Sequence, residues 1–232
     1  MMNNLTDVVA ALKECSDPSY REAITRYNVP NEKALGIKSP DLRKLGKTIG
    51  VNHSLALQLW DCGIHEAKTL ASYIADPEQI TEAQVDQWVN EFYSWDICDN
   101  TCNFLVKTPF TYQKVIEWSS AKKEFVKRAG FVMMVNLAIH DKKASDEVFV
   151  PYFPIIEREA WDERNFVKKA VNWALRQLGK RSLFLHSHAI ETAHSIKAQG
   201  TKPAKWIAND ALRELLSPKV IARLNQKKLS RK

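Results

Sequence analysis

A tryptophan and an aspartate stand one helical turn apart near the middle of the sequence. Trp95 and Asp99 are four residues apart, so in a helix an indole ring lies beside a carboxylate on one face. Trp88 and Phe92 continue the spacing, and we expect all four on one helix that follows Pro77. On spacing alone, Asp99 could instead cap a helix or pair with a lysine, and Trp95 could belong to the apolar core.

Another tryptophan lies among basic residues in the second half of the chain. Residues 166–178 have apolar side chains three and four apart, which indicates a helix with one buried stripe. Trp173 falls on the flank of that stripe, beside Lys169 and Arg176. An aromatic ring among cations is a candidate for contact with a nucleic-acid sugar or base.

A pair of basic residues recurs at a fixed interval. Lys127 and Arg128 return 41 residues later as Lys168 and Lys169, within matching Phe-Val-x-x-Ala segments. A further step of 41 reaches residues 207–211, which keep the apolar spacing without the basic pair. An all-helical period in the low forties is typical of HEAT and armadillo repeats. We expect both pairs to line a concave basic face that suits duplex DNA, although such charges are often simply solvated.

Helix signals recur along the chain. A capping residue directly before proline marks the start of a helix. This combination occurs at Asp17-Pro18, Ser39-Pro40, Asp76-Pro77, Thr108-Pro109 and Ser217-Pro218. Between these points the apolar residues recur three and four apart rather than alternately. The sequence therefore predicts an all-α protein, a right-handed α-solenoid of HEAT- or armadillo-like repeats in which residues 1–232 form a single domain.

Composition excludes several classes of protein. Seven glycines and nine prolines among 232 residues disfavour a turn-rich all-β fold. No stretch has the length and apolarity of a membrane span, and the first residues lack the features of a secretion signal, so we expect a cytoplasmic protein without membrane contact. Four cysteines are too few for a disulfide framework. For Cys98 and Cys102, buried thiols are a better interpretation than a metal site.

The charge is unevenly distributed. The net charge is +7, yet residues 1–116 hold 11 basic and 15 acidic side chains, whereas residues 117–232 hold 23 and 12. A basic half of this kind indicates a polyanionic partner. Nucleic acid fits better than a membrane surface, because no isolated helix combines a basic run with an apolar face.

Four motifs follow one another in a recognisable order. They are Leu-Gly-Ile-Lys-Ser-Pro at 35–40 with Arg43 behind it, Ser-Trp-Asp-Ile-Cys-Asp at 94–99, Lys-Arg-Ala at 127–129, and Phe-Val-Lys-Lys-Ala-Val-Asn-Trp-Ala-Leu-Arg at 166–176. Together they resemble the bacterial alkylpurine DNA glycosylases built from HEAT-like repeats, the AlkD-like DNA alkylation repair proteins. The resemblance covers nearly the whole chain.

The resemblance implies a monofunctional, cofactor-free enzyme that hydrolyses the N-glycosidic bond of N3- and N7-alkylated purines in duplex DNA, without an obligate protein partner. It implies that Asp99 is the catalytic carboxylate, that Trp95 and Trp173 cradle the deoxyribose, and that Arg128 grips the DNA backbone. A carboxylate there would stabilise the oxocarbenium-like sugar that forms as the bond breaks, and indole faces would add attraction for that cation. The DNA-binding residues would then be Lys127, Lys168, Lys169 and Arg176.

Two other functions agree with the same sequence. The first is a non-catalytic HEAT-repeat module that binds bent or branched DNA with the same basic face. The second is a protein-binding α-solenoid whose charge is incidental.

Overall fold

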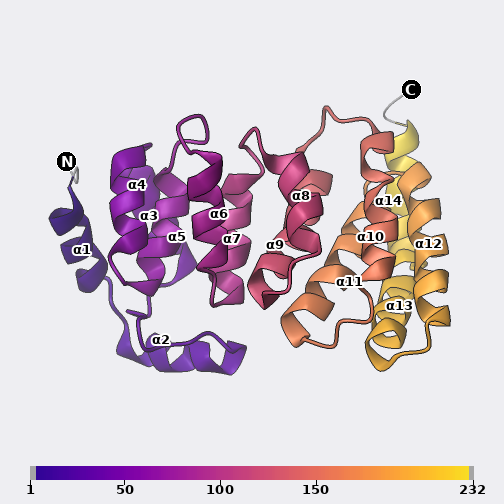
Figure 1. The fold of residues 1–232 in the computed structure, drawn as a ribbon, viewed down its shortest axis with the longest axis horizontal. Helices are drawn as coiled ribbons and strands as arrows, with labels where there is room; N and C mark the ends of the chain where they lie inside the picture. The colour runs from indigo at the N-terminus through magenta and orange to yellow at the C-terminus, as the bar shows by residue number, and fades with distance from the viewer. Residues whose placement is uncertain (1–3, 230–232) are drawn as a thin grey trace. The chain divides into compact units, whose positions relative to one another are not determined.

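The structure is a computed structural model that describes residues 4–229, and every regular element in that range is helical (Figure 1). The predicted all-α fold is therefore confirmed. The chain divides into two compact units, residues 1–111 and residues 112–232. No helix of the described residues is long and apolar enough to cross a membrane.

The amino-terminal unit centres on α5, which packs against α3, α4 and α7. A stacked tryptophan pair lies between α4 and α6, where the ring centroids of Trp60 and Trp88 are 4.1 Å apart. The elements of this unit are α1 (Leu5–Glu14), α2 (Pro18–Ala23), the 3-10 helix η1 (Ile24–Tyr27), α3 (Ser39–Ile49), α4 (His53–Asp61), α5 (His65–Ile74), α6 (Glu82–Asn90) and α7 (Trp95–Leu105).

One buried carboxylate fixes the loop before α3. Glu66 on α5 is 3% exposed, and its carboxylate accepts hydrogen bonds from the backbone amides of Leu35, Gly36 and Ile37 at 2.7–3.1 Å. Gly36 has a φ of +82° and lies against the start of α2, where an added Cβ would come within 2.1 Å of the Asp17 carbonyl oxygen. Only glycine fits this approach.

In the carboxy-terminal unit, α11 packs against both α9 and α13. Arg128 Nη1 on α9 donates to the Phe166 carbonyl on α11 at 2.7 Å, and Asn172 Nδ2 on α11 donates to Asp210 on α13 at 2.7 Å. Both contacts join residues 38 apart, but they do not occupy equivalent positions of the 41-residue repeat, because Arg128 corresponds to Lys169 and not to Asn172. The elements are α8 (Thr111–Ser119), which starts at the end of the first unit, α9 (Glu124–His140), η2 (Asp146–Phe149), α10 (Tyr152–Arg158), α11 (Asn165–Gly179), α12 (Leu183–Ala198), α13 (Lys202–Leu215) and α14 (Pro218–Leu229).

The proline signals succeed at three of their five positions. Helices begin at Pro18, Ser39 and Pro218 as predicted. The prediction is wrong at Asp76-Pro77 because the Asp76 side chain accepts hydrogen bonds from Glu78 and Gln79, which closes a turn instead. The next helix begins at Glu82, where Thr81 and Gln84 form a capping box. After Thr108-Pro109, α8 begins only at Thr111.

The expected single helix through Trp88 and Trp95 is also wrong. Helix α6 ends at Asn90, and α7 begins at Trp95 after Ser94, which is extended with φ of −145° and ψ of 147°. Trp88 therefore belongs to the stacked core pair, whereas Trp95 opens a separate helix.

Candidate functional site

The first turns of α7 hold the tryptophan and the aspartate that the sequence singles out. Trp95 is the first residue of α7 and Asp99 lies one turn further along, and both are half-buried. The Trp95 indole Nε1 donates to the Tyr27 carbonyl oxygen at 2.8 Å, and its ring packs against a small cluster of Ile24, Val29 and Ala34. The ring is thus held in a fixed position outside the central core.

A buried network supports the same helix end. His65, the first residue of α5, is 3% exposed. Its Nε2 lies 2.7 Å from Asp96 Oδ2, and its Nδ1 lies 3.0 Å from the Tyr93 hydroxyl. Ser94 also donates to Asp96. Burial raises the pKa of Asp96, but the hydrogen bonds from His65 and Ser94 outweigh burial, so this pKa lies below its ordinary value.

Sequence reasoning missed this network because its two halves lie on different helices. His65 and Asp96 are 31 residues apart, so no local spacing joins them. Their effect is local, however, because Asp96 lies between Trp95 and Asp99 on α7. The Asp96 carboxylate lies in the first turn of α7, where the positive end of the helix dipole stabilises its negative charge. Together these contacts fix the backbone from which Trp95 and Asp99 project.

A cavity of about 310 Å³ adjoins this helix end. Aromatic side chains of Tyr20, Tyr27 and Trp95 contribute to its wall, together with the polar groups of His65 and Asp96. The cavity lies within the amino-terminal unit, between α7 and the segment formed by α2 and η1. Trp95 is thus accessible from this side although its indole nitrogen is engaged.

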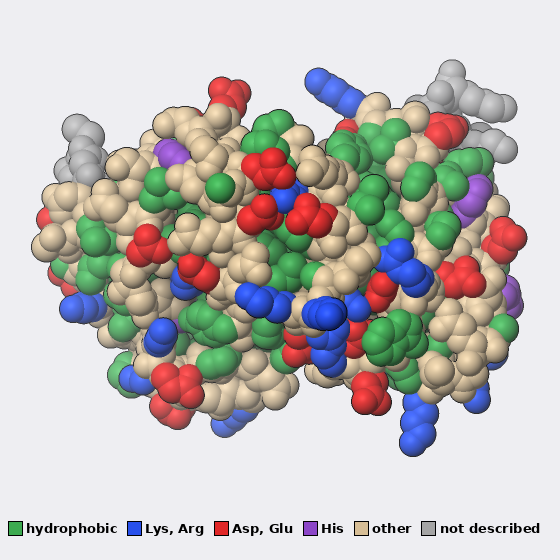
Figure 2. All heavy atoms as spheres, in the orientation of Figure 1, with side chains coloured by type: hydrophobic (Ala, Val, Ile, Leu, Met, Phe, Trp, Pro, Cys, Tyr) green, Lys and Arg blue, Asp and Glu red, His purple; other side chains and the backbone are tan. Residues whose placement is uncertain are grey.

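The carboxy-terminal unit holds the remaining predicted site residues. Trp173 on α11 is half-buried, Lys169 is exposed, and Lys168 lies with its Nζ 5.0 Å from the centre of the Trp206 ring. Arg176 forms ion pairs with Glu214 and, at 3.7 Å, with Asp210. Figure 2 shows Asp and Glu side chains interspersed with Lys and Arg on the visible face of this unit.

Lys127 does not lie on a basic surface strip, and that expectation is wrong. Its side chain is buried, with Nζ 2.7 Å from Glu159 and 3.3 Å from Asp162. The repeat aligns Lys127 with Lys168, but α9 is buried from Val126 to Ala138, whereas α11 has an exposed flank. Arg128 is also mostly buried, at 6% exposure. Contact of either residue with DNA stays a prediction.

Lys127→Ala is expected to destabilise the protein. Two carboxylates that are 6% and 1% exposed would lose their shared cation. Arg158 and Arg164 keep their own contacts with them, so the free energy of unfolding should fall by about 2–3 kcal/mol, below the roughly 3–5 kcal/mol of a fully uncompensated pair. Urea denaturation measures the difference. A loss below about 0.5 kcal/mol, as expected for an exposed lysine, would contradict the structural role.

The described residues contain no group of three or more His, Cys, Asp or Glu side chains able to hold a metal ion. Cys98 and Cys102 are both buried thiols on α7, as the sequence predicts. They form part of the core beneath the exposed side of this helix.

An all-helical chain in which α11 packs against both α9 and α13 has the architecture of a HEAT-like helical-repeat protein. A solved structure with the same fold is described as "a new family of proteins related to the HEAT-like repeat DNA glycosylases with affinity for branched DNA structures". It aligns with a TM-score of 0.74 at 20% identity, over 92% of this chain and 96% of its own.

The chain belongs to the DNA alkylation repair enzyme family, whose sequence profile matches residues 8–215. None of the curated proteins compared with the chain matches it. The family resemblance expected from the motifs is therefore confirmed, and the similar structure supports the HEAT-like fold.

Proposed function

We propose that this protein is a DNA glycosylase that hydrolyses the N-glycosidic bond of N3- and N7-alkylated purines in duplex DNA. The observation that supports it most directly is the start of α7, where Asp99 lies one turn from an indole ring that a backbone carbonyl holds in place. Membership of the DNA alkylation repair enzyme family agrees with this chemistry.

The proposed reaction uses Asp99 as an electrostatic catalyst. An alkylated purine carries a positive charge and is a good leaving group, so the main barrier is the oxocarbenium-like sugar that forms as the bond breaks. A carboxylate beside that sugar stabilises its positive charge and orients the attacking water. The Trp95 ring adds attraction that strengthens as the sugar becomes cationic.

The carboxy-terminal unit is proposed to supply the other contacts with DNA. Trp173 would lie against the deoxyribose, and Arg128 would bind the backbone. Lys168, Lys169 and Arg176 would bind phosphates. Arg176 would do so while paired with Glu214 and Asp210. These pairs fix the position of its guanidinium, but the two carboxylates offset the positive charge that a phosphate would meet.

A non-catalytic module for branched DNA is the second candidate. The similar solved structure belongs to a family described as having affinity for branched DNA structures. One experiment separates the two candidates: the wild-type protein is incubated with duplexes that contain N7-methylguanine or N3-methyladenine, and free base is measured. We expect release. No release from a duplex that the protein demonstrably binds would leave the binding module.

Changing Lys168 and Lys169 together to alanine should weaken binding to all DNA sequences alike. Contacts with phosphate depend on charge and not on sequence, so the slope of log affinity against log salt should fall by about two. Fluorescence anisotropy over a salt series measures both quantities. The matched control is Lys142→Ala with Lys143→Ala, two exposed lysines of the same unit. A loss confined to certain sequences would contradict the phosphate role.

A further inference from the structure

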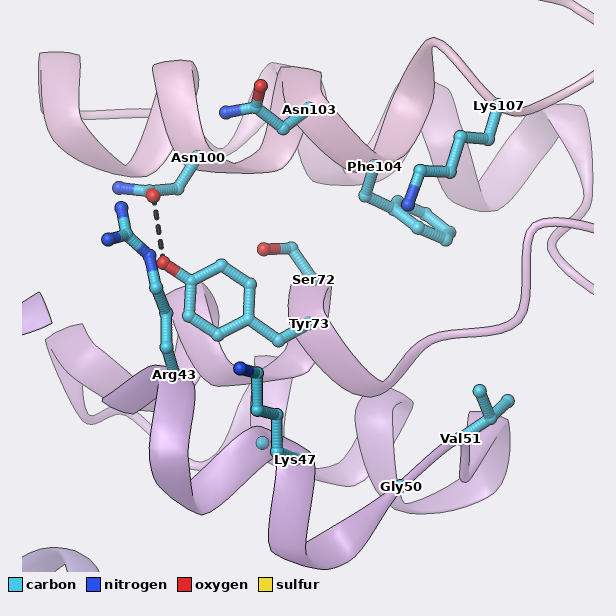
Figure 3. Close-up of a pocket in the computed structure, with 11 residues that line it drawn as sticks. Arg43, Lys47, Gly50, Val51, Ser72, Tyr73, Asn100, Asn103, Phe104 and Lys107 are labelled. Atoms are coloured by element: carbon cyan, nitrogen blue, oxygen red, sulfur yellow. Dashed lines mark hydrogen bonds between the residues drawn. The ribbon is translucent and has the colours of Figure 1, made fainter. Parts of the chain in front are cut away.

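A second cavity of the amino-terminal unit, of about 430 Å³, lies between α3, α5 and α7 (Figure 3). Arg43 and Lys47 reach it from α3, Tyr73 from α5, and Asn100 and Asn103 from α7. Lys107, just beyond α7, lies at the opposite side of the cavity from Arg43 in Figure 3. This cavity is separate from the one beside Trp95, although Asn100 contributes to the walls of both.

The wall of this cavity is positively charged. Arg43, Lys47 and Lys107 are exposed, and none of the described residues that line the cavity is acidic. The contrast is informative because the surrounding half of the chain is net acidic. The helix dipole alone could explain the presence of Lys47, because a cation in the last turn of α3 is stabilised by the negative end of that dipole. That explanation does not extend to Arg43, which lies one turn earlier.

A hydrogen-bonded chain positions the Arg43 end of the cavity. The Tyr73 hydroxyl donates to Asn100 Oδ1 at 2.9 Å, and Asn100 Nδ2 donates to the Asp96 carbonyl oxygen at 2.8 Å. Burial raises the pKa of Tyr73 above its ordinary value, although the adjacent Arg43 guanidinium opposes this. Tyr73 therefore remains a neutral hydrogen-bond donor at physiological pH.

We propose that this cavity binds backbone phosphates of a DNA strand, through Arg43, Lys47 and Lys107. Three cations spread over facing walls match a polymer with several phosphates better than one compact anion. The half-buried ring of Tyr73 lines the same cavity and offers an apolar surface that suits the sugars between those phosphates. The inference rests on the proposed function, since the strand would pass the α7 residues next to Asp99. The amino-terminal unit would then contribute to DNA affinity despite its net negative charge.

The test is the triple variant Arg43→Ala, Lys47→Ala, Lys107→Ala. Its matched control is Lys13→Ala, Lys33→Ala, Lys44→Ala, which removes three exposed cations of the same unit outside the cavity. Lys44 directly follows Arg43 on α3 but does not line the cavity, so the control removes a cation from almost the same place on the helix. Affinity for an unmodified duplex is measured by fluorescence anisotropy between low and moderate salt. Thermal unfolding of each variant verifies that it is folded.

We expect the cavity variant to bind at least about tenfold more weakly at low salt, with the salt slope reduced by about two to three, while the control changes by less than about threefold. Equal effects of the two variants would overturn the cavity assignment and leave the proposed function intact, provided that the wild type binds DNA and releases base. No binding of DNA by the wild type would overturn both.

The source of the phosphate is tested in the same assay. Inorganic phosphate should displace DNA from the wild type no more than chloride does at equal ionic strength. Selective displacement by phosphate that the cavity variant no longer shows would assign the cavity to a free anion and overturn the strand assignment.

Discussion

Asp99→Asn is expected to release free base from an N7-methylguanine duplex at least tenfold more slowly than the wild type, a loss of more than about 1.4 kcal/mol of barrier stabilisation. Asparagine keeps the size of the side chain and removes the negative charge that would face the sugar cation. The hydrogen bond from Asn103 Nδ2 goes to the Asp99 backbone oxygen, so this contact survives the substitution.

The measurement is single-turnover base release at saturating protein, with binding to the same duplex determined separately. Affinity for unmodified DNA should be retained or increased, because a negative charge is removed. Asp61→Asn, an exposed aspartate at the end of α4, is the matched control and should react like the wild type. Wild-type release with an unchanged rate in Asp99→Asn would keep the glycosylase and remove Asp99 from its mechanism.

Gly36→Ala is expected to cause the largest loss of stability, about 3 kcal/mol or more. The new Cβ would lie 2.1 Å from the Asp17 carbonyl oxygen and 2.6 Å from the Arg21 nitrogen. Those two atoms form the first hydrogen bond of α2, at 2.9 Å. Relief of the overlap must therefore move either the start of α2 or the loop that Glu66 holds.

Gly63→Ala is the matched control for this change. Gly63 has the same φ of +82°, but an added Cβ would meet no atom within 4 Å, so its cost of about 1 kcal/mol reflects only the left-handed backbone. The difference between the two variants in urea denaturation isolates the steric clash. Equal losses would show that the loop yields freely and that close packing at Gly36 contributes little.

Periodic features were predictable from the sequence, and features that join distant segments were not. The 41-residue repeat predicts α9 and α11, and Trp95 and Asp99 share a helix as their spacing requires. Trp88 continues the same spacing, yet it lies on a different helix from Trp95. The backbone is extended at Ser94, so a new helix begins at Trp95. Apolar spacing alone does not detect such a break.

Charges were the least predictable part of the candidate site. Lys127 and Lys168 occupy equivalent repeat positions, but the burial of each depends on which helices cover it. The carboxylates that bind Lys127 lie more than 30 residues away in sequence, as does the His65 partner of Asp96. Long-range ion pairs of this kind leave no pattern in the local sequence. Residue type alone therefore predicted that Lys127 is a surface cation, whereas in the fold it is buried.

The acceptor that holds the Trp95 ring belongs to the main chain of position 27 and not to its side chain. Any amino acid there would offer the same carbonyl oxygen, so substitution of Tyr27 should leave the hydrogen bond to the Trp95 indole in place. It depends instead on the path of the peptide, which turns at Asn28 with a φ of 56°. Releasing the indole for mobility studies would therefore require rerouting this turn, for example by a residue that disfavours left-handed geometry.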